Sequence, residues 1–498
     1  MRTDIGKRPA AIPSTQRVLE CGTMFRAWLT VGLILVFGGC AIVRSTNPYA
    51  GLAGPMPIGM PERDSLGSDS GHPVEQPMTL ERALLVALAN NPGIAASGQA
   101  VAAASAARDI AAADRLPRIG LSGGYMRHLE EQRLVPPSIP GEASVYAADI
   151  LTADVVASMP LFTGGRLINR VKAAELMEES AAHRLERERD ELVFKVTEAF
   201  FDILAQRRVV ESLQFSREAL VEHLRRVEQM ISVQKAARVD LLRTEVRVAD
   251  IEQKLAREQG LLAIREQILG SLLGLSDQEM RGLAVQGDLE IGVEEQVELG
   301  EASDVEVALE RAYGHRRDYL AARANLEAEA RRVDVARSEY MPTLVLQGSY
   351  GTRLAPYARD EPDGGAATAD LGRIGVMLEL PLFEGGRTRA TVARERANLG
   401  AARERLRELE LRIRLEVESA AVSIHSSSQR IRATAKASEQ AEESLRIERQ
   451  RYELGRGSIT DVLDAQSALL EAQTSHYRSL ADYRTALALL VLAVGEEI

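Results

Sequence analysis

Apolar residues between positions 185 and 231 recur at steps of seven, four or three, which is the spacing of a heptad seam. The seam consists of Leu192, Val196, Ala199, Ile203, Val210, Leu213, Leu220, Leu224, Val227 and Ile231. Sustained over about seven heptads, it predicts one long helix, from about Arg166 to Gln234, that buries a narrow stripe against a neighbouring helix. The segment contains no proline, and at about 1.5 Å per residue the helix could reach roughly 100 Å.

The second half of the chain carries another seam, in which steps of three and four alternate. Its members are Ile459, Val462, Gln466, Leu469, Gln473, His476, Leu480, Tyr483, Leu487, Leu490 and Val494. Because the period is again helical, we expect a second set of long helices packed side by side. The polar members of this seam suit an interface that is wet or shared.

Segments in which polar and apolar residues alternate precede the long helices, and they predict strands with two different faces. In the first half, the alternation sets Thr152, Asp154 and Ser158 against Val155, Ala157 and Met159. Residues 343–350 and 371–380 repeat the pattern, with Arg373 and Glu379 on the polar face of the latter. Each half thus offers two strands of about ten residues, joined by a loop that contains Pro136-Pro137 or residues 362–365.

Strands of this length with one polar and one apolar face are typical of membrane-spanning barrels. Four strands cannot close a barrel by themselves, and an open sheet edge is not tolerated in lipid. The pattern therefore predicts that several chains contribute strands to one barrel.

The order of these elements occurs twice in the chain. The segment LFTGGR at 161–166 returns as LFEGGR at 382–387, an offset of 221 positions (382 − 161), each time after a proline. The same offset carries VDLL at 239–242 onto TDVL at 460–463, and a nearby offset carries Leu116-Pro117 onto Met341-Pro342. We infer two homologous halves.

The composition narrows the class of protein further. Aromatic residues make up only 4% of the 498 residues, and the single tryptophan, Trp28, lies near the amino terminus, so a large globular core is not expected. The net charge of −11 argues against nucleic acid as a partner, because a phosphate-binding surface needs a basic excess.

The amino terminus indicates export. Arg26 precedes an apolar run from Ala27 to Phe37, and Gly38-Gly39-Cys40 follows, which is similar to a bacterial lipobox with Cys40 as the lipidation site. A plain signal peptide or a short membrane anchor is the alternative. The segment that follows, rich in proline, glycine and serine, is expected to be a tether.

The chain as a whole resembles the TolC-like outer membrane efflux proteins. The resemblance rests on Asn91-Pro92, the segments 160–166 and 381–387, RYELG at 451–455 and TDVLDA at 460–465. It implies a mainly α protein with a small β part: a long α-helical coiled-coil barrel continued into a trimeric, twelve-stranded transmembrane β-barrel. The chain departs from the family at Arg317, where proline is frequent, and at Gln234, where glycine is frequent.

The expected organisation has five parts. A signal peptide at 1–39 and a lipid-anchored linker at 40–77 precede a first repeat at 78–280, a connection at 281–301 and a second repeat at 302–498. Each repeat holds a helix, a strand pair and a long helix pair. The resemblance places the helical part in the periplasm and the strands in the bacterial outer membrane.

In this family the tunnel closes where the helix pairs turn back. Asp461 and Asp464 lie one helical turn apart at the start of the last helix, so a threefold assembly would gather six carboxylates into a periplasmic constriction. Helix capping by Asp461 is the alternative reading of the same residues. Tyr452, Asp240 and Arg456 are similar to residues that tie neighbouring helix pairs shut.

No enzyme is expected. The pattern GLSGG around Ser122 matches a nucleophile elbow, but a strand continues where that motif needs a helix. No metal spacing or phosphate-binding loop occurs, so neither a catalytic residue nor a cofactor or metal is predicted.

The sequence predicts the passive exit duct of a tripartite efflux or type I secretion system. The expected partners are two further copies of the chain, a periplasmic adaptor, an inner-membrane pump driven by protons or ATP, and outer-membrane lipids. A periplasmic coiled-coil scaffold or adaptor without a pore would use the same heptads. Only the two-faced strand pairs separate the two functions.

Overall fold

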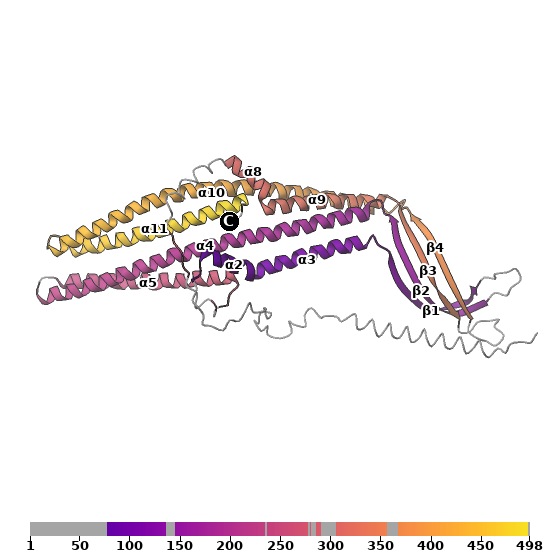
Figure 1. The fold of residues 1–498 in the computed structure, drawn as a ribbon, viewed down its shortest axis with the longest axis horizontal. Helices are drawn as coiled ribbons and strands as arrows, with labels where there is room; N and C mark the ends of the chain where they lie inside the picture. The colour runs from indigo at the N-terminus through magenta and orange to yellow at the C-terminus, as the bar shows by residue number, and fades with distance from the viewer. Residues whose placement is uncertain are drawn as a thin grey trace, which may run out of the picture. The chain divides into compact units, whose positions relative to one another are not determined.

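A computed structural model describes residues 77–135, 145–234, 237–276, 279, 285–289, 305–355 and 367–496 (Figure 1). The chain divides into a unit at Met1–Pro73 and a unit at Val74–Ile498, and the described residues all belong to the second. The predicted signal peptide, the tether and Cys40 lie outside the described residues, as do the two loops of the strand pairs.

The elements of the first half follow the predicted order and include one more short helix. They are α2 (Leu80–Asn90), α3 (Pro92–Ala113), β1 (Arg118–Val135), β2 (Val145–Phe162), α4 (Arg166–Ser232) and α5 (Arg238–Leu273). The long helix predicted from the first seam thus begins at Arg166 as expected and ends within two residues of the expected end.

The second half repeats this order. Its elements are α8 (Val305–His315), α9 (Arg317–Arg337), a 3₁₀ turn η2 (Ser338–Tyr340), β3 (Thr343–Ala355), β4 (Ala367–Glu379), α10 (Arg387–Glu453) and α11 (Ile459–Val494). α4 and α10 both have 67 residues, and α5 and α11 both have 36, which is what a duplicated unit predicts.

The four strands form one antiparallel sheet in the order β1-β2-β3-β4, so β2 and β3 join the two halves. Leu121 pairs with Val155, Val155 with Tyr350, and Tyr350 with Gly372, which places the predicted apolar positions in common rows. The strands have 18 residues in the first half and 13 in the second, so the expected length of about ten was too short. The expectation counted only the residues in which polar and apolar side chains alternate strictly. In the β1–β2 pair, the backbone hydrogen bonding continues beyond these residues and past register shifts.

Two glycines shape each passage from strand to long helix. Gly164 and Gly165 have φ of +62° and +86°, and Gly385 and Gly386 have +62° and +88°. A side chain in this left-handed region costs roughly 1–2 kcal/mol. At Gly164, a Cβ would also lie 2.4 Å from Cβ of Met341, whereas no atom of the described residues lies within 4 Å of a Cβ at Gly385 or Gly386, so the two copies of the motif share the backbone requirement and not the steric one.

α4 packs against its own partner and against helices of the other half, whereas the main neighbours of α10 belong to its own half. α4 contacts α5, α3, α9 and α11, while α10 contacts α11 and α9 (Figure 1). Seven members of the predicted first seam are buried: Leu192, Val196, Ile203, Val210, Leu213, Leu220 and Val227. Phe200, Phe201 and Leu204 are buried as well, because a helix with several neighbours buries a wider stripe than a two-helix seam.

The described part of the connection between the halves returns to the start of the first repeat. Val285 forms a parallel bridge with Met78, and the N–H of Gln286 donates to the carbonyl of Met78 at 3.0 Å. Val285 and Leu289 are buried in the cluster that also contains Phe200 of α4. In the described part of the chain, no helix combines the length and the apolar character needed to cross a membrane.

Candidate functional site

The predicted constriction lies where the long helix pairs turn back, at the end away from the sheet (Figure 1). In the turn from α10 to α11, Gly455 has a φ of +68° and its N–H donates to the carbonyl of Tyr452 at 3.0 Å. Ser458 then caps α11, since its Oγ accepts the N–H of Thr460 at 3.1 Å. The carboxylate of Asp461 accepts the N–H of Ser458 at 3.2 Å, which forms the capping box considered from the sequence.

The turn from α4 to α5 follows the same plan with a different central residue. Gln234 takes the place that Gly455 has in the second repeat, and it adopts a φ of +60°. The chain therefore keeps the left-handed turn at a position where a side chain disfavours it. The carboxylate of Asp240 accepts the N–H of Ala237 at 3.3 Å, as Asp461 does in the other repeat.

Asp461 and Asp464 are both exposed, but they have different partners. Asp461 closes the capping box, whereas Oδ1 of Asp464 lies 3.2 Å from Nη2 of Arg247. Arg247 belongs to α5, so this ion pair joins the two repeats. The gathering of six carboxylates around a threefold axis stays a prediction.

Arginines of α5 are the neighbours that the sequence did not predict for this site. Besides the Arg247–Asp464 pair, Nη1 of Arg243 donates to Oγ1 of Thr460 at 3.3 Å. The sequence signal was a pair of arginines one turn apart on α5 that matches the spacing of Thr460 and Asp464. The sequence does not show which helices lie side by side, so it could not identify Thr460 and Asp464 as the partners of these arginines.

Tyr452 lies in a partly buried contact between α10 and α4. Its ring centroid is 5.5 Å from that of His223, and the next residue, Glu453, forms an ion pair of 3.2 Å with Arg226. Burial raises the pKa of Tyr452, and the negative charge of Asp240 adds to that effect. The direct ring neighbour of Tyr452 is therefore His223, and no hydrogen bond joins Tyr452 to Asp240 among the described residues.

The imidazole of His223 is partly buried at this contact. Burial lowers its pKa, and the positive charges of Arg226 and Arg449 lower it further. Its Nε2 is shielded from solvent and has no hydrogen-bond partner among the described residues. The third tying candidate, Arg456, makes a backbone bond from its N–H to the carbonyl of Arg451 at 2.8 Å. No contact of the Arg456 side chain supports the tying role within the described part of the chain.

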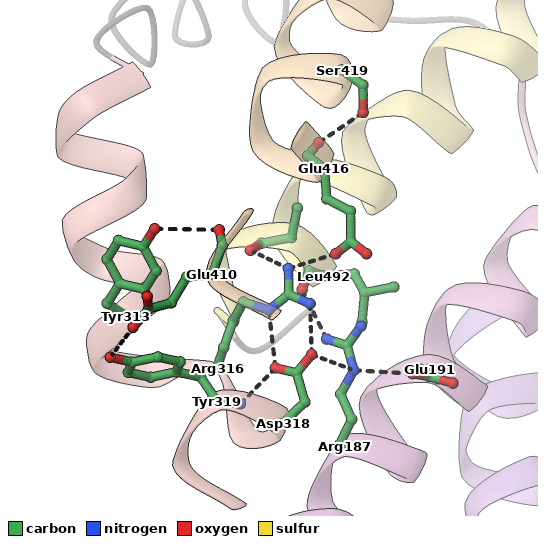
Figure 2. A network of polar contacts seen from close by, with 11 residues as sticks. Arg187, Glu191, Tyr313, Arg316, Asp318, Tyr319, Glu410, Glu416, Ser419 and Leu492 are labelled. Carbon is green, nitrogen blue, oxygen red and sulfur yellow. Dashed lines mark hydrogen bonds and ion pairs between the residues drawn. The ribbon is translucent and has the colours of Figure 1, made fainter. Parts of the chain in front are cut away.

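A buried arginine fixes the second repeat at the junction of α8 and α9 (Figure 2). Arg316 is 1% exposed, and its Nε and Nη2 donate to the two carboxylate oxygens of Asp318 at 3.0 and 2.7 Å. Its Nη1 donates to Glu416 of α10 at 2.6 Å and to the carbonyl of Ala493 in α11 at 3.2 Å. Burial acts to raise the pKa of Asp318, but the contacts with Arg316 outweigh it and hold the pKa below the usual range.

A second arginine meets the same end of α11. Nη1 of Arg187 in α4 donates to the carbonyl of Leu492 at 3.2 Å, while its Nε donates to Glu191 at 3.0 Å (Figure 2). Two cations at a helix carboxyl terminus compensate the negative end of the helix dipole. Gly495 ends the helix with a φ of +79°, and a Cβ there would lie 2.9 Å from the backbone nitrogen of Arg316.

The first repeat makes the equivalent junction without charges. Asn91, between α2 and α3, accepts the N–H groups of Gly93 at 2.8 Å and Ile94 at 3.3 Å through Oδ1. Its Nδ2 donates to the carbonyl of Leu272 at 2.9 Å, near the end of α5. Gly274 ends α5 with a φ of +66°. One asparagine thus caps α3 and binds the end of α5.

The features that would suggest catalysis do not form a reactive site. Ser122 lies inside β1, paired in register with Asp154, and the strand continues to Val135 instead of turning into a helix. Within the described ranges, no group of three or more His, Cys, Asp or Glu residues is arranged to hold a metal ion. An alanine-rich groove of about 700 Å³ between α3, α4 and α9 includes Ala104, Ala107 and Ala174.

Several known proteins are similar to this chain. The chain matches the family described as outer membrane efflux protein over residues 84–275 and 308–496. It is 24% identical over 393 residues to the outer membrane protein TolC of Vibrio cholerae, covering 76% of this chain and 82% of that protein. It is also 24% identical over 406 residues to the cobalt-zinc-cadmium resistance protein CzcC of Cupriavidus metallidurans, covering 80% and 85%.

A solved structure supports the same fold. The outer membrane protein VceC of Vibrio cholerae superposes with a TM-score of 0.70 at 20% sequence identity, covering 84% of this chain and 96% of VceC. The family resemblance inferred from the sequence motifs is therefore confirmed, and the mainly helical architecture is that of outer membrane channel structures.

Proposed function

Because this chain belongs to the outer membrane efflux protein family, we propose that three copies of it form a channel across the bacterial outer membrane. The channel is the passive exit duct of a tripartite efflux or type I secretion system. It receives small molecules or proteins from a periplasmic adaptor and an inner-membrane pump.

The observation that carries this proposal is the open sheet. β1 and β4 stand at its two edges within one chain. Ile119 and Ile374 lie in one row, from edge to edge, and are 75% and 81% exposed. Lipid can cover such an apolar face, and edge strands of neighbouring copies can pair with one another, which gives twelve strands from three chains.

The opposite face of the sheet suits a water-filled interior. It presents Ser122, Asp154 and Arg373 at positions that alternate with the apolar rows. Nε of Arg373 donates to Oγ of Ser349 on the adjacent strand at 2.9 Å. A scaffold without a pore has no use for a sheet with these two faces.

The proposal includes an anchor and a constriction. Cys40 would carry the lipid that holds the amino terminus at the outer membrane, with the helices in the periplasm. Asp461 and Asp464 would line the narrowest point, and Tyr452 and Asp240 would help to hold neighbouring helix pairs closed. The ring contact of Tyr452 with His223 of α4 and the exposure of both aspartates are compatible with these roles.

Purification in detergent and reconstitution into planar bilayers test the channel. We expect a trimer that passes small cations over anions and is blocked by multivalent cations. Changing Asp461 and Asp464 together to Ala should abolish the block and reduce the selectivity without breaking the trimer. Asp482→Ala is the matched control, because Asp482 is an exposed α11 carboxylate paired with Arg430 at 2.8 Å.

Two results would contradict the proposal. A monodisperse monomer without conductance would favour the scaffold function. A double variant that loses thermal stability but keeps its cation block would return both aspartates to helix capping and place the constriction elsewhere.

A further inference from the structure

Two arginines of α5 meet two polar residues of α11 beside the helix-pair turns. Nη1 of Arg243 donates to Oγ1 of Thr460 at 3.3 Å, and Nη2 of Arg247 lies 3.2 Å from Oδ1 of Asp464. In each helix the two residues are one turn apart, so α5 and α11 run side by side in the same direction here. Thr460 and Asp464 of α11 therefore each contact a different arginine of α5.

The repeat makes these two helices equivalent, yet their charges differ. The offset of 221 positions that aligns LFTGGR with LFEGGR also aligns Asp240 with Asp461 and Arg243 with Asp464. The first aligned pair keeps a capping carboxylate in both repeats. The second pair has opposite charges, so α5 is basic where α11 is acidic, and the two faces attract each other.

Exposure decides what this ion pair can do. The side chain of Arg247 is 32% exposed and that of Asp464 is 67% exposed. Water and salt screen such a pair, so it contributes little to stability. The same exposure lets a dissolved cation reach Asp464, and the guanidinium and the dissolved cation then compete for one carboxylate.

We propose, resting on the proposed function that places Asp464 in the constriction, that Arg247 sets the cation affinity of the channel by occupying Asp464. In a threefold assembly, three of the six carboxylates then carry a tethered counter-ion. A multivalent cation has to displace the guanidinium before it binds these three. Arg247 therefore weakens the block and reduces the preference for cations, and Arg243 adds positive charge one turn away.

A purely structural role makes a different prediction. If Arg247 only ties α5 to α11, its removal changes the thermal stability of the trimer and leaves ion preference alone. If it competes with cations, the loss of its charge increases cation binding while the trimer stays intact. Block by hexaamminecobalt(III) in planar bilayers separates the two roles.

The decisive variant is Arg247→Gln, which keeps a donor of similar length and removes the charge. We expect its half-blocking concentration to fall roughly threefold to tenfold, because three screened ion pairs are removed together. Arg247→Lys should behave like the unaltered channel. Arg208→Gln is the matched control, since Arg208 forms an exposed pair of 3.1 Å with Glu211 within α4.

Asp464→Asn separates failure of this inference from failure of the proposed function. If Asp464→Asn weakens the block while Arg247→Gln leaves it unchanged, the constriction stands and the role of Arg247 is wrong. If neither variant alters the block, Asp464 does not line the constriction and both proposals fail there. If Arg247→Gln strengthens the block and the double variant behaves like Asp464→Asn, competition for this carboxylate is established.

Discussion

Replacing Arg316 by Met should strongly destabilise the second repeat, because Arg316 joins α8 and α9 to α10 and to the end of α11. The guanidinium is 1% exposed and donates to Asp318, to Glu416 and to the carbonyl of Ala493. Methionine fills part of the same volume but donates no hydrogen bond. Two carboxylates and the end of α11 then lose their shared cation.

The magnitude follows from what the substitution leaves behind. Removing one partner of a buried ion pair costs about 3–5 kcal/mol, because the remaining charge is uncompensated. The side chains of Asp318 and Glu416 are 23% and 35% exposed, so water solvates the two carboxylates in part and reduces this cost. We therefore expect a loss of about 3 kcal/mol in the free energy of unfolding.

The pH dependence gives a second readout. Contacts with Arg316 hold the pKa of Asp318 low in the folded protein, so this stability is present above the unfolded pKa of about 3.9. It is lost as the pH falls through the folded value. Without Arg316, burial still acts to raise the pKa of Asp318, and only Arg187 and the backbone N–H of Tyr319 oppose it, so the variant should lose stability at a higher pH than the unaltered protein.

The assay is denaturation in detergent followed by circular dichroism of the helices, at neutral pH and at pH 4 to 5. Arg317→Met is the matched control, because Arg317 is the next residue and its side chain has no hydrogen bond or ion pair with the described residues. If both variants unfold at the same midpoint, the network contributes no net stability and the reasoning fails.

Three further predictions concern other parts of the chain. Gln234→Gly should raise stability by up to about 1 kcal/mol and Gly455→Ala should lower it by about as much, measured as unfolding midpoints, because both positions have positive φ. Since burial and two nearby arginines lower the pKa of His223, its contribution to the closed contact is present above about pH 6.5 and is lost on acidification. Conductance should therefore rise in acid, and His223→Phe should remove this dependence. Cys40→Ser should abolish incorporation of labelled fatty acid, and an unmodified mature amino terminus downstream of Cys40 in the unaltered protein would disprove lipidation.

The long helices could be predicted from the sequence because their signal is local. Each seam repeats many times without a proline, so small irregularities do not hide it. The helix expected from about Arg166 to Gln234 is observed as Arg166–Ser232. Neither seam specifies which helix covers it, and the additional burial of Phe200 and Leu204 on α4 depends on those neighbours.

Strand length was less predictable for a physical reason. Alternation reports the part of a strand that separates two environments, whereas backbone pairing continues for as long as a partner strand is present. β1 and β2 remain paired beyond Arg127, after a register shift. The predicted length of about ten residues therefore described the amphipathic part of each strand and not the whole ladder.

The candidate site shows the same division between local and distant information. The cap formed by Asp461 depends on residues three positions away, so the sequence contains everything needed to predict it. The partner of Asp464 is Arg247, 217 positions earlier, and no periodicity connects them. Arg316 is similar: its neighbour Asp318 is local, while Glu416 and Ala493 come from two distant helices.

Divergence between the two halves has a physical consequence where their equivalent helices lie close together. Unchanged copies would place like charges at like positions, as Asp240 and Asp461 still do, and like charges repel one another. Reversing the charge at one aligned position, with Arg243 in one repeat and Asp464 in the other, converts neighbours that repel into neighbours that attract. Within a single chain, Arg243 contacts Thr460 and Arg247 contacts Asp464, so the acidic residue at the aligned position pairs with the second of the two α5 arginines. The contacts of Arg243 and Arg247 with α11 remain exposed to water, so dissolved ions can compete for them, whereas the buried network at Arg316 keeps the junction at the other end of α11 fixed.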